Sequence, residues 1–348
     1  MSAKRPTQSD VAKRAGVSRG TVSLVLNNQA NGRVPISEET QQRVREAAAE
    51  LGYTPNPVAQ MLVQGSNMLM GVFSYEMPFP YDEGDFFFPY LLGIQRAAIQ
   101  NEYNVLLFTR SHRDGAASIY SEGMNGLHLA DGSVLLGGDP DREELRRLAD
   151  EGYPFVYIGR REVPGAEISW VANDYQQGSY DITGQLLELG HRHIAFVAGS
   201  LHLEHKIDKL KGVQQAVTTW AAQDGHVSTI EDGLLHEPAR FVAHIREQGI
   251  TAILTDDSKG LLGVLAICAQ HGIAVPQELS VASLVSVDHP HLFDIRPTYV
   301  HLNRHQVGET AAQILVERLL GLREIQQVLI PCRVVEGDSI GPAPKMTS

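Results

Sequence analysis

Three short stretches among residues 1–62, here called the head, repeat apolar positions at helical spacing. The first stretch predicts a helix over 8–15. Ser9 or Asp10 is expected to cap its start, and Gly16 permits the left-handed turn that ends it.

A second helix is predicted from a cap at Ser18 to about Leu26. Ala12, Gly16 and Val22 have the spacing of a tight helix-turn-helix, because the small residue lets the helices approach and the β-branched residue fills their junction. The polar residues of this helix have no use in a generic three-helix scaffold, which favours a DNA-reading role.

A third helix is predicted to start at Ser37 and stop at Gly52, with Glu38 and Glu39 at its positive end. Its apolar positions predict a buried face made of Val44, Ala47, Ala48 and Leu51.

From Met68 onward, short apolar runs alternate with helical stretches. The runs predict buried strands at 69–75, 104–110, 132–138, 154–160, 193–199, 251–257 and 279–285. Helices are predicted at 89–101, 141–151, 175–189, 206–223, 238–248 and 258–271. This alternation predicts α/β layers with mostly parallel sheets, and its restart after about residue 165 predicts two similar lobes.

Composition and charge add a contrast between the two regions. The 348 residues are 43% hydrophobic and 20% charged, with no apolar run near the ~18 residues of a membrane span. The amino terminus lacks an apolar signal core, so we expect a cytoplasmic protein. The net charge is −12, but residues 1–62 carry +3 and the remainder −15. A basic head on an acidic body can bind phosphates locally.

The strings DVAKRAGVSRGTVSLVLN and ISEETQQRVREAAAELGYTPNPVAQML closely resemble the head and hinge of the lactose-repressor (LacI/GalR) family from Thr7 to Leu62. Three stretches of the body also match, at 171–200, 251–281 and 308–321. The resemblance implies an all-α helix-turn-helix head and an α/β periplasmic-binding-protein-like core of two lobes with parallel sheets. We expect a DNA-binding domain at 1–55, a hinge helix and linker at 56–67, an effector-binding and dimerisation domain at 68–340, and a flexible tail at 341–348.

The resemblance also implies which head residues meet DNA. Arg19, Gly20 and Leu24 occupy the base-reading positions, and an arginine can donate two hydrogen bonds to guanine. Leu24 departs from the polar reader of many members, so the operator sequence is not readable. The positions that would mostly hold phosphates are Thr7, Ser18, Thr21, Ser23 and Asn27.

Residues 56–62 resemble the hinge helix that folds only on DNA and pairs with its dimer mate. Leu62 falls on the position that wedges into the minor groove, and Ala59 on the close-packing position. A plain linker is the alternative for this segment, although it suits residues 64–67 better.

In the family a small effector binds between the lobes, and the chain crosses between them three times. The segment after about Pro297 should therefore return to the first lobe before a final strand at 329–335 in the second. The family's effector-gripping arginine is here Lys209, and its G-[FY]-D-D stretch is here Ser283 to Ser286, with Asp288 out of register. Both departures argue against a simple free sugar.

Aromatic and charged residues near predicted strand ends are the candidates for effector binding. Any single aromatic could instead pack under its loop, and Asp256 or Asp257 could instead cap the helix that begins near Ser258. The candidates are Phe79, Tyr81, Phe86, Phe87, Arg160, Lys209, Asp256 and Asp257.

No nucleophile elbow, phosphate-binding loop or dinucleotide fingerprint occurs, so we expect no enzyme and no cofactor. Histidines pair at 191 and 193, at 289 and 291, and at 301 and 305, but carboxylate and thiol ligands do not cluster with them. Solvated or helix-terminal histidines are therefore expected in place of a metal site.

These features predict a ligand-responsive DNA-binding regulator that represses transcription as a homodimer on a near-palindromic operator. The effector would be a sugar, a glycoside or another planar or polar metabolite. A cytoplasmic small-molecule binding protein without operator function is the alternative. The effector's identity, its sign of action, the operator and the choice between dimer and tetramer are not readable from the chain.

Overall fold

A computed structural model describes residues 6–26, 36–54, 66–76, 86–109, 117–121, 123–220, 225–288, 290 and 294–345. The chain forms two compact units, Met1–Met68 and Leu69–Ser348. The second unit is here called the core, and each unit is described by itself.

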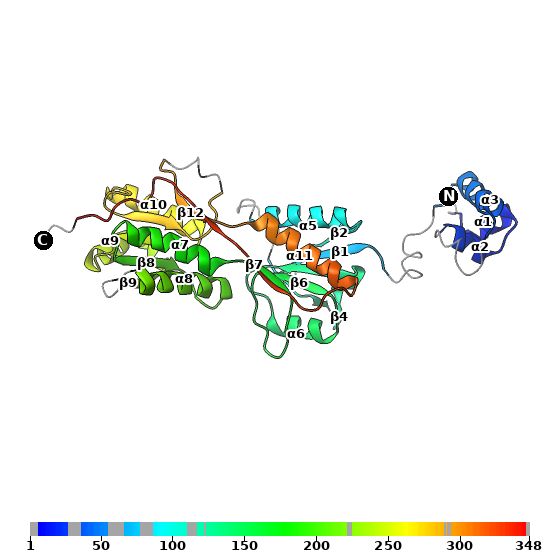
Figure 1. The fold of residues 1–348 in the computed structure, drawn as a ribbon, viewed down its shortest axis with the longest axis horizontal. Coiled ribbons are helices and arrows are strands. Elements are labelled where there is room, and N and C mark those ends of the chain that lie inside the picture. The colour runs from blue at the N-terminus through cyan, green and yellow to red at the C-terminus, as the bar shows by residue number, and fades with distance from the viewer. Residues whose placement is uncertain are drawn as a thin grey trace. The chain divides into compact units, whose positions relative to one another are not determined.

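The head contains the three predicted helices, α1 (Gln8–Ala15), α2 (Arg19–Leu26) and α3 (Glu38–Leu51), drawn in blue in Figure 1. Gly16 and Gly52 end α1 and α3 at φ 67° and 63°, where a side chain would be strained. One small apolar cluster holds the helices together, made of Val11, Ala12, Ala15, Val22, Val25, Val44, Ala47 and Ala48.

Two details of the predicted head are wrong. The N-cap of α1 is Thr7, not Ser9 or Asp10, and its hydroxyl accepts from the Asp10 amide. Asp10 completes the cap from the third helical position, where its carboxylate accepts from the Thr7 amide at 2.8 Å. This reciprocal capping box places the cap one residue before the helix. Leu51 is 36% exposed instead of buried, since it lies in the last turn beside the left-handed Gly52.

The first lobe of the core, lobe one, is a parallel six-stranded sheet in the order β13-β7-β6-β5-β1-β2. Helices α5 (Phe88–Gln100) and α11 (Arg304–Leu319) pack together on one face, and α6 (Arg142–Asp150) packs on the other. A small hairpin of β3 (Tyr120–Ser121) and β4 (Met124–Asn125) precedes the 3-10 helix η1 (Gly126–Leu129). The strands are β1 (Leu69–Ser74), β2 (Asn104–Phe108), β5 (Gly132–Leu136), β6 (Phe155–Ile158), β7 (Trp170–Asn173) and β13 (Gln327–Ile330).

The second lobe, lobe two, is a six-stranded sheet in the order β14-β12-β11-β10-β8-β9, in which only the β12–β14 pair is antiparallel. Helices α7 (Tyr175–Glu188) and α8 (Glu204–Trp220) cover one face; α9 (Pro238–Glu247) and α10 (Ser258–His271) cover the other, near η2 (Asp232–His236). The strands are β8 (His193–Ala198), β9 (His226–Glu231), β10 (Ala252–Thr255), β11 (Ser280–Ser283), β12 (Thr298–His301) and β14 (Arg333–Val335).

The three crossings between lobes are present, but their places differ from the prediction. Lobe one extends through β7, past the expected restart at about residue 165. The return occurs after His301 and not after Pro297, because β12 still pairs with β11 in lobe two. The predicted final strand at 329–335 is two strands, since β13 pairs in lobe one and β14 in lobe two.

The predicted flexible tail at 341–348 is wrong for its first residues. The Gly341 amide donates to the Ser280 hydroxyl at 3.0 Å, and the Ala343 amide donates to the Leu189 carbonyl at 2.9 Å. These bonds hold the segment against lobe two; residues 346–348 lie outside the described part of the chain. Among the described helices, none combines the length and apolar character that crossing a membrane requires.

Candidate functional site

Helix α2 presents a buried side and a polar side. Val22 and Val25 lie in the head's apolar cluster, while Ser18, Arg19 and Gly20 at its amino end are exposed. The Ser18 hydroxyl accepts from the Thr21 amide at 3.1 Å, so the predicted cap is confirmed. The amino end of a helix is electropositive and directs its amides outward, which suits phosphate and base contacts.

The remaining head candidates divide into two groups. Thr21, Ser23 and Leu24 are half-buried on α2, and Thr7 caps α1 at the same time as it keeps its hydroxyl at the surface. Their contacts with DNA remain predictions. Asn27, Ala59 and Leu62 lie outside the described residues.

The lobe boundary of the core is defined here by the first turns of α6 and α8 and the residues that follow β6 and β10. Glu204 accepts two bonds from Arg142 Nη2, at 2.9 and 3.0 Å, and one from the Glu162 amide at 3.0 Å. The predicted candidate Arg160 donates to both carboxylate oxygens of Asp208, at 2.8 and 2.7 Å, and also contacts Glu162. Ion pairs therefore join lobe one to lobe two.

The structure brings together the candidates Lys209 and Asp256. Lys209 is only 2% exposed, and its Nζ donates to the Asp256 carboxylate and to the Asp256 carbonyl, both at 2.7 Å. Lys206 Nζ lies 3.0 Å from the other carboxylate oxygen. Each oxygen of this carboxylate is thus in contact with a lysine.

The field around this pair is positive. Burial by itself would raise the pKa of Asp256, but the ammonium groups of Lys209 and Lys206 outweigh it and lower that pKa to about 2. Burial, and then the charge of Lys209, lower the pKa of His205 to about 3. Lys209 Nζ also lies 5.2 Å from the ring centre of Tyr175.

Asp257 caps a helix, as the alternative to ligand binding predicts. Its carboxylate accepts from the Gly260 amide at 2.7 Å and caps α10. Its neighbour Asp256 is directed to the lysines, so two adjacent acidic residues serve different purposes.

The aromatic candidates are separated by burial. Phe87 is 8% exposed and lies in the apolar cluster of lobe one, so the packing alternative describes it and ligand binding does not. Phe86 is 43% exposed, and the Arg304 guanidinium carbon lies 5.4 Å from its ring centre. Arg304 also forms a 2.6 Å ion pair with Asp288, the acidic residue out of register. Phe79 and Tyr81 lie outside the described residues.

Sequence reasoning missed Arg142, Arg161 and Glu204. Arg161 is 5% exposed, and its Nη2 donates to the Gly137 and Gly138 carbonyls at 2.8 and 2.7 Å. A signal was available for Arg161, because charged residues directly follow the buried strand β6 at the carboxyl edge of the sheet. Glu204 gave no such signal, since its partners are distant in sequence.

His191 was expected to be solvated or helix-terminal, but it is fully buried. Its Nδ1 lies 2.9 Å from the Thr251 hydroxyl and its Nε2 lies 3.0 Å from the Gly341 carbonyl. Burial lowers its pKa, so the ring is a neutral structural bridge. Among the described residues, no three metal-binding side chains converge.

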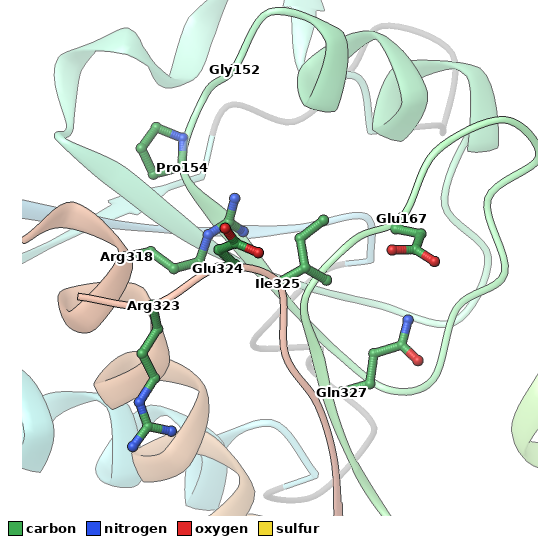
Figure 2. A pocket seen from close by; sticks show the side chains of 8 residues that line it. All are labelled: Gly152, Pro154, Glu167, Arg318, Arg323, Glu324, Ile325 and Gln327. Carbon is green, nitrogen blue, oxygen red and sulfur yellow. The ribbon is translucent and has the colours of Figure 1, made fainter. Parts of the chain in front are cut away.

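A hollow of about 750 Å³ opens elsewhere on lobe one (Figure 2). Pro154 precedes β6, Glu167 precedes β7 and Ile325 precedes β13, so it lies at the amino ends of these strands. Arg318 from α11 lines it and donates to the Phe155 carbonyl at 2.7 Å. The lobe boundary is instead at carboxyl ends, where ligands of open α/β sheets bind.

Comparison with known proteins matches both units. Residues 7–56 match the model of bacterial regulatory proteins of the lacI family, and residues 183–340 match a periplasmic binding protein-like domain. The transcriptional regulator MalR of Streptococcus pneumoniae is 30% identical over 340 residues, covering 95% of this chain and 99% of MalR. The regulator CelR of Thermobifida fusca is 28% identical, covering 91% of this chain and 93% of CelR.

Solved structures agree with this match. A CelR–cellobiose complex is 26% identical, covers 96% of this chain and 100% of its own, and has a TM-score of 0.64. The Lac repressor dimer bound to operator and the anti-inducer ONPF is 23% identical and shares the fold at a TM-score of 0.73. The match covers 97% of this chain and 100% of the Lac repressor chain. The chain therefore belongs to the lacI family of bacterial regulatory proteins and is a helix-turn-helix transcriptional regulator.

Proposed function

We propose that this regulator represses transcription as a homodimer on a near-palindromic operator, and that a small molecule bound at the lobe boundary controls its affinity for DNA. The observation that carries the proposal is the amino end of α2, where a buried underside supports an exposed Ser18-Arg19-Gly20 edge. A single head of this size buries little surface on DNA, so two heads about one helical turn apart are needed for specific binding.

Each head residue has a definite role in the proposal. Arg19 donates to a guanine edge, Gly20 and Leu24 approach neighbouring bases, and the hydroxyls of Thr7, Ser18, Thr21 and Ser23 meet phosphates. Asn27 adds a phosphate contact, while Ala59 and Leu62 belong to the paired hinge segment that enters the minor groove.

The ion pairs across the lobe boundary supply the control. They join the lobes through Arg142–Glu204 and Arg160–Asp208, so a ligand that alters them changes the relative stability of open and closed cores. The hinge at 56–67 would pass that change to the head. In this proposal Arg160, Lys209 and Asp256 line the effector site, where Asp256 acts by holding Lys209 and Lys206. The exposed ring of Phe86 is the aromatic candidate that remains for it.

Gel retardation on a palindrome-containing fragment of the upstream DNA, across a salt series, tests the proposal. We expect specific retardation that Arg19→Ala weakens and Leu62→Ala nearly abolishes. Lys13→Ala is the matched control, because it removes one exposed positive charge from α1 and should weaken specific and non-specific DNA equally. Equal binding of all fragments by the unmodified chain would favour a binding protein without operator function.

A further inference from the structure

Positive charge is in excess at the lobe boundary. Of the ion-paired side chains there that are less than one-third exposed, five are cations and three are carboxylates. Glu162 also contacts Arg160, but it is 79% exposed and compensates little. Net charge that is shielded from solvent is costly, so this excess of cations points to a missing anion. The cations are Arg142, Arg160, Arg161, Lys206 and Lys209, and the carboxylates are Glu204, Asp208 and Asp256.

Two buried donors at the same place lack an acceptor among the described residues: Arg142 Nη1 and Arg161 Nε. The Arg161 side chain is 3% exposed. Buried guanidinium N–H groups ordinarily find an acceptor, because leaving one unmade costs about 1–3 kcal/mol. Their partner oxygens are therefore expected to come from a ligand.

The arginines and lysines act on one shared region. Arg161 Nη1 lies 3.6 Å from Glu204, the carboxylate that holds Arg142. Burial lowers the pKa of His205 on α8, and the charges of Lys209, Arg161 and Lys206 lower it further against the opposing charge of Asp256. The cations of lobe one and lobe two thus form a single positive region.

A neutral sugar fits this region poorly. The carboxylate that would accept sugar hydroxyls, Asp256, already accepts from Lys209 and Lys206. The serines that replace the family's acidic stretch are also engaged, since Ser286 accepts from the Leu302 amide at 2.8 Å. Unused donors therefore remain at the boundary, but few unused acceptors.

We infer that the controlling small molecule carries an anionic group, a phosphate or a carboxylate, which Arg142, Arg161 and Lys206 bind. The inference rests on the proposed function and names the chemical class of its effector. Guanidinium groups bind the oxygens of such groups in a fork, and an ammonium adds a point charge. Arg142 Nη2 stays with Glu204, while Nη1 and Arg161 Nε, which are buried in this structure, take the ligand oxygens when the lobes part to admit the ligand.

Thermal unfolding of the full chain tests the inference, with sodium phosphate compared against sodium chloride at equal ionic strength. Binding to the folded state should raise the unfolding midpoint in phosphate. Arg142→Met and Lys206→Met should each reduce that gain at least threefold; using both keeps the test valid if one variant does not fold. Arg296→Met is the control, because this exposed arginine pairs with Asp338 away from the boundary. Any general stabilisation by phosphate is common to all variants.

Three further probes separate the sources of the anion. Glucose 6-phosphate represents a phosphate, glucuronate a carboxylate, and glucose the neutral sugar. A gain from either acid, lost in Arg142→Met and Lys206→Met, supports the inference and identifies the group. No gain from phosphate or either acid, equal gains in all variants, or an equal gain from glucose would overturn it.

Operator retardation on the same preparations distinguishes this inference from the proposed function. If the chain retards the operator specifically but its unfolding does not depend on any anion, only the inference of an anionic effector is contradicted. Anion dependence without specific retardation removes the operator function alone, and leaves an anion-binding core.

Discussion

The head and the lobe boundary use charge in opposite ways. In the head, Arg19 is exposed on a helix whose stability depends on the small apolar cluster beneath it. At the lobe boundary, Lys209 and Arg161 are 2% and 5% exposed and bind carboxylates and carbonyls of the protein itself. An exposed cation can be exchanged with little effect on folding, whereas a buried one contributes to folding and recognition together. DNA specificity and effector specificity should therefore respond differently to mutation.

The largest effect is expected from Asp256→Ala, which leaves Lys209 and Lys206 without their carboxylate. Removing one partner of a buried ion pair costs about 3–5 kcal/mol of unfolding free energy. Urea unfolding followed by tryptophan fluorescence measures the core alone, because Trp170 and Trp220 are the chain's two tryptophans. Asp338→Ala, which breaks the exposed pair with Arg296, should leave the curve almost unchanged. Equal losses in the two variants would contradict the contrast between buried and exposed charge.

Arg19→Ala should instead change recognition and leave folding intact. Loss of a two-bond contact to guanine costs about 1–3 kcal/mol of discrimination. Gel retardation on specific and scrambled fragments measures the discrimination, and circular dichroism measures the helices. A drop in helix content, or an equal loss on both fragments, would show that Arg19 does not read bases.

Acid should weaken the core through His205. Its pKa is about 3 in the folded chain and near 6.5 when unfolded, so between these values the unfolded chain binds the extra proton. The stabilisation is complete above pH 6.5 and decreases as the pH falls, by at most about 1.4 kcal/mol per pH unit. Urea unfolding at pH 7.5, 6.5 and 5.5 gives the unfolding free energy at each pH. This free energy should depend less steeply on pH in His205→Gln than in the unmodified chain. The exposed His236→Gln is the control, and an unchanged slope in His205→Gln would contradict the prediction.

The smallest effect is expected from Gly20→Ala. An added Cβ would meet the Ser18 hydroxyl at 3.6 Å, an ordinary contact, so the helix can accept it. Alanine should stabilise the head by at most about 1 kcal/mol, and its methyl group would stand at a base-reading position. Hydrogen exchange of the α2 amides in the full chain measures the stability of the head, residues 1–68. If Gly20→Ala changes which operators are bound while the head becomes more stable, the residue affects base recognition independently of folding.

The chain by itself determined the three head helices, their turn glycines and the alternation of strands and helices in the core, because these depend on local spacing. It also identified Lys209 as a candidate, because lysine replaces the family's arginine there, and Asp256, because it lies at the end of a predicted strand. Predictions based on neighbouring residues were less reliable at boundaries, where Thr7 displaced the expected caps and β13 and β14 divided one expected strand.

Only the tertiary structure decided which charges meet. Glu204 lies 62 residues after Arg142 and Lys209 lies 47 before Asp256, so no local pattern relates the members of either pair. Their pairing depends on the packing of two sheets and the helices that cover them. Within the described part of the chain, the same packing buries Arg161 and leaves two arginine N–H groups without acceptors, so an anionic effector could be inferred only from the folded core.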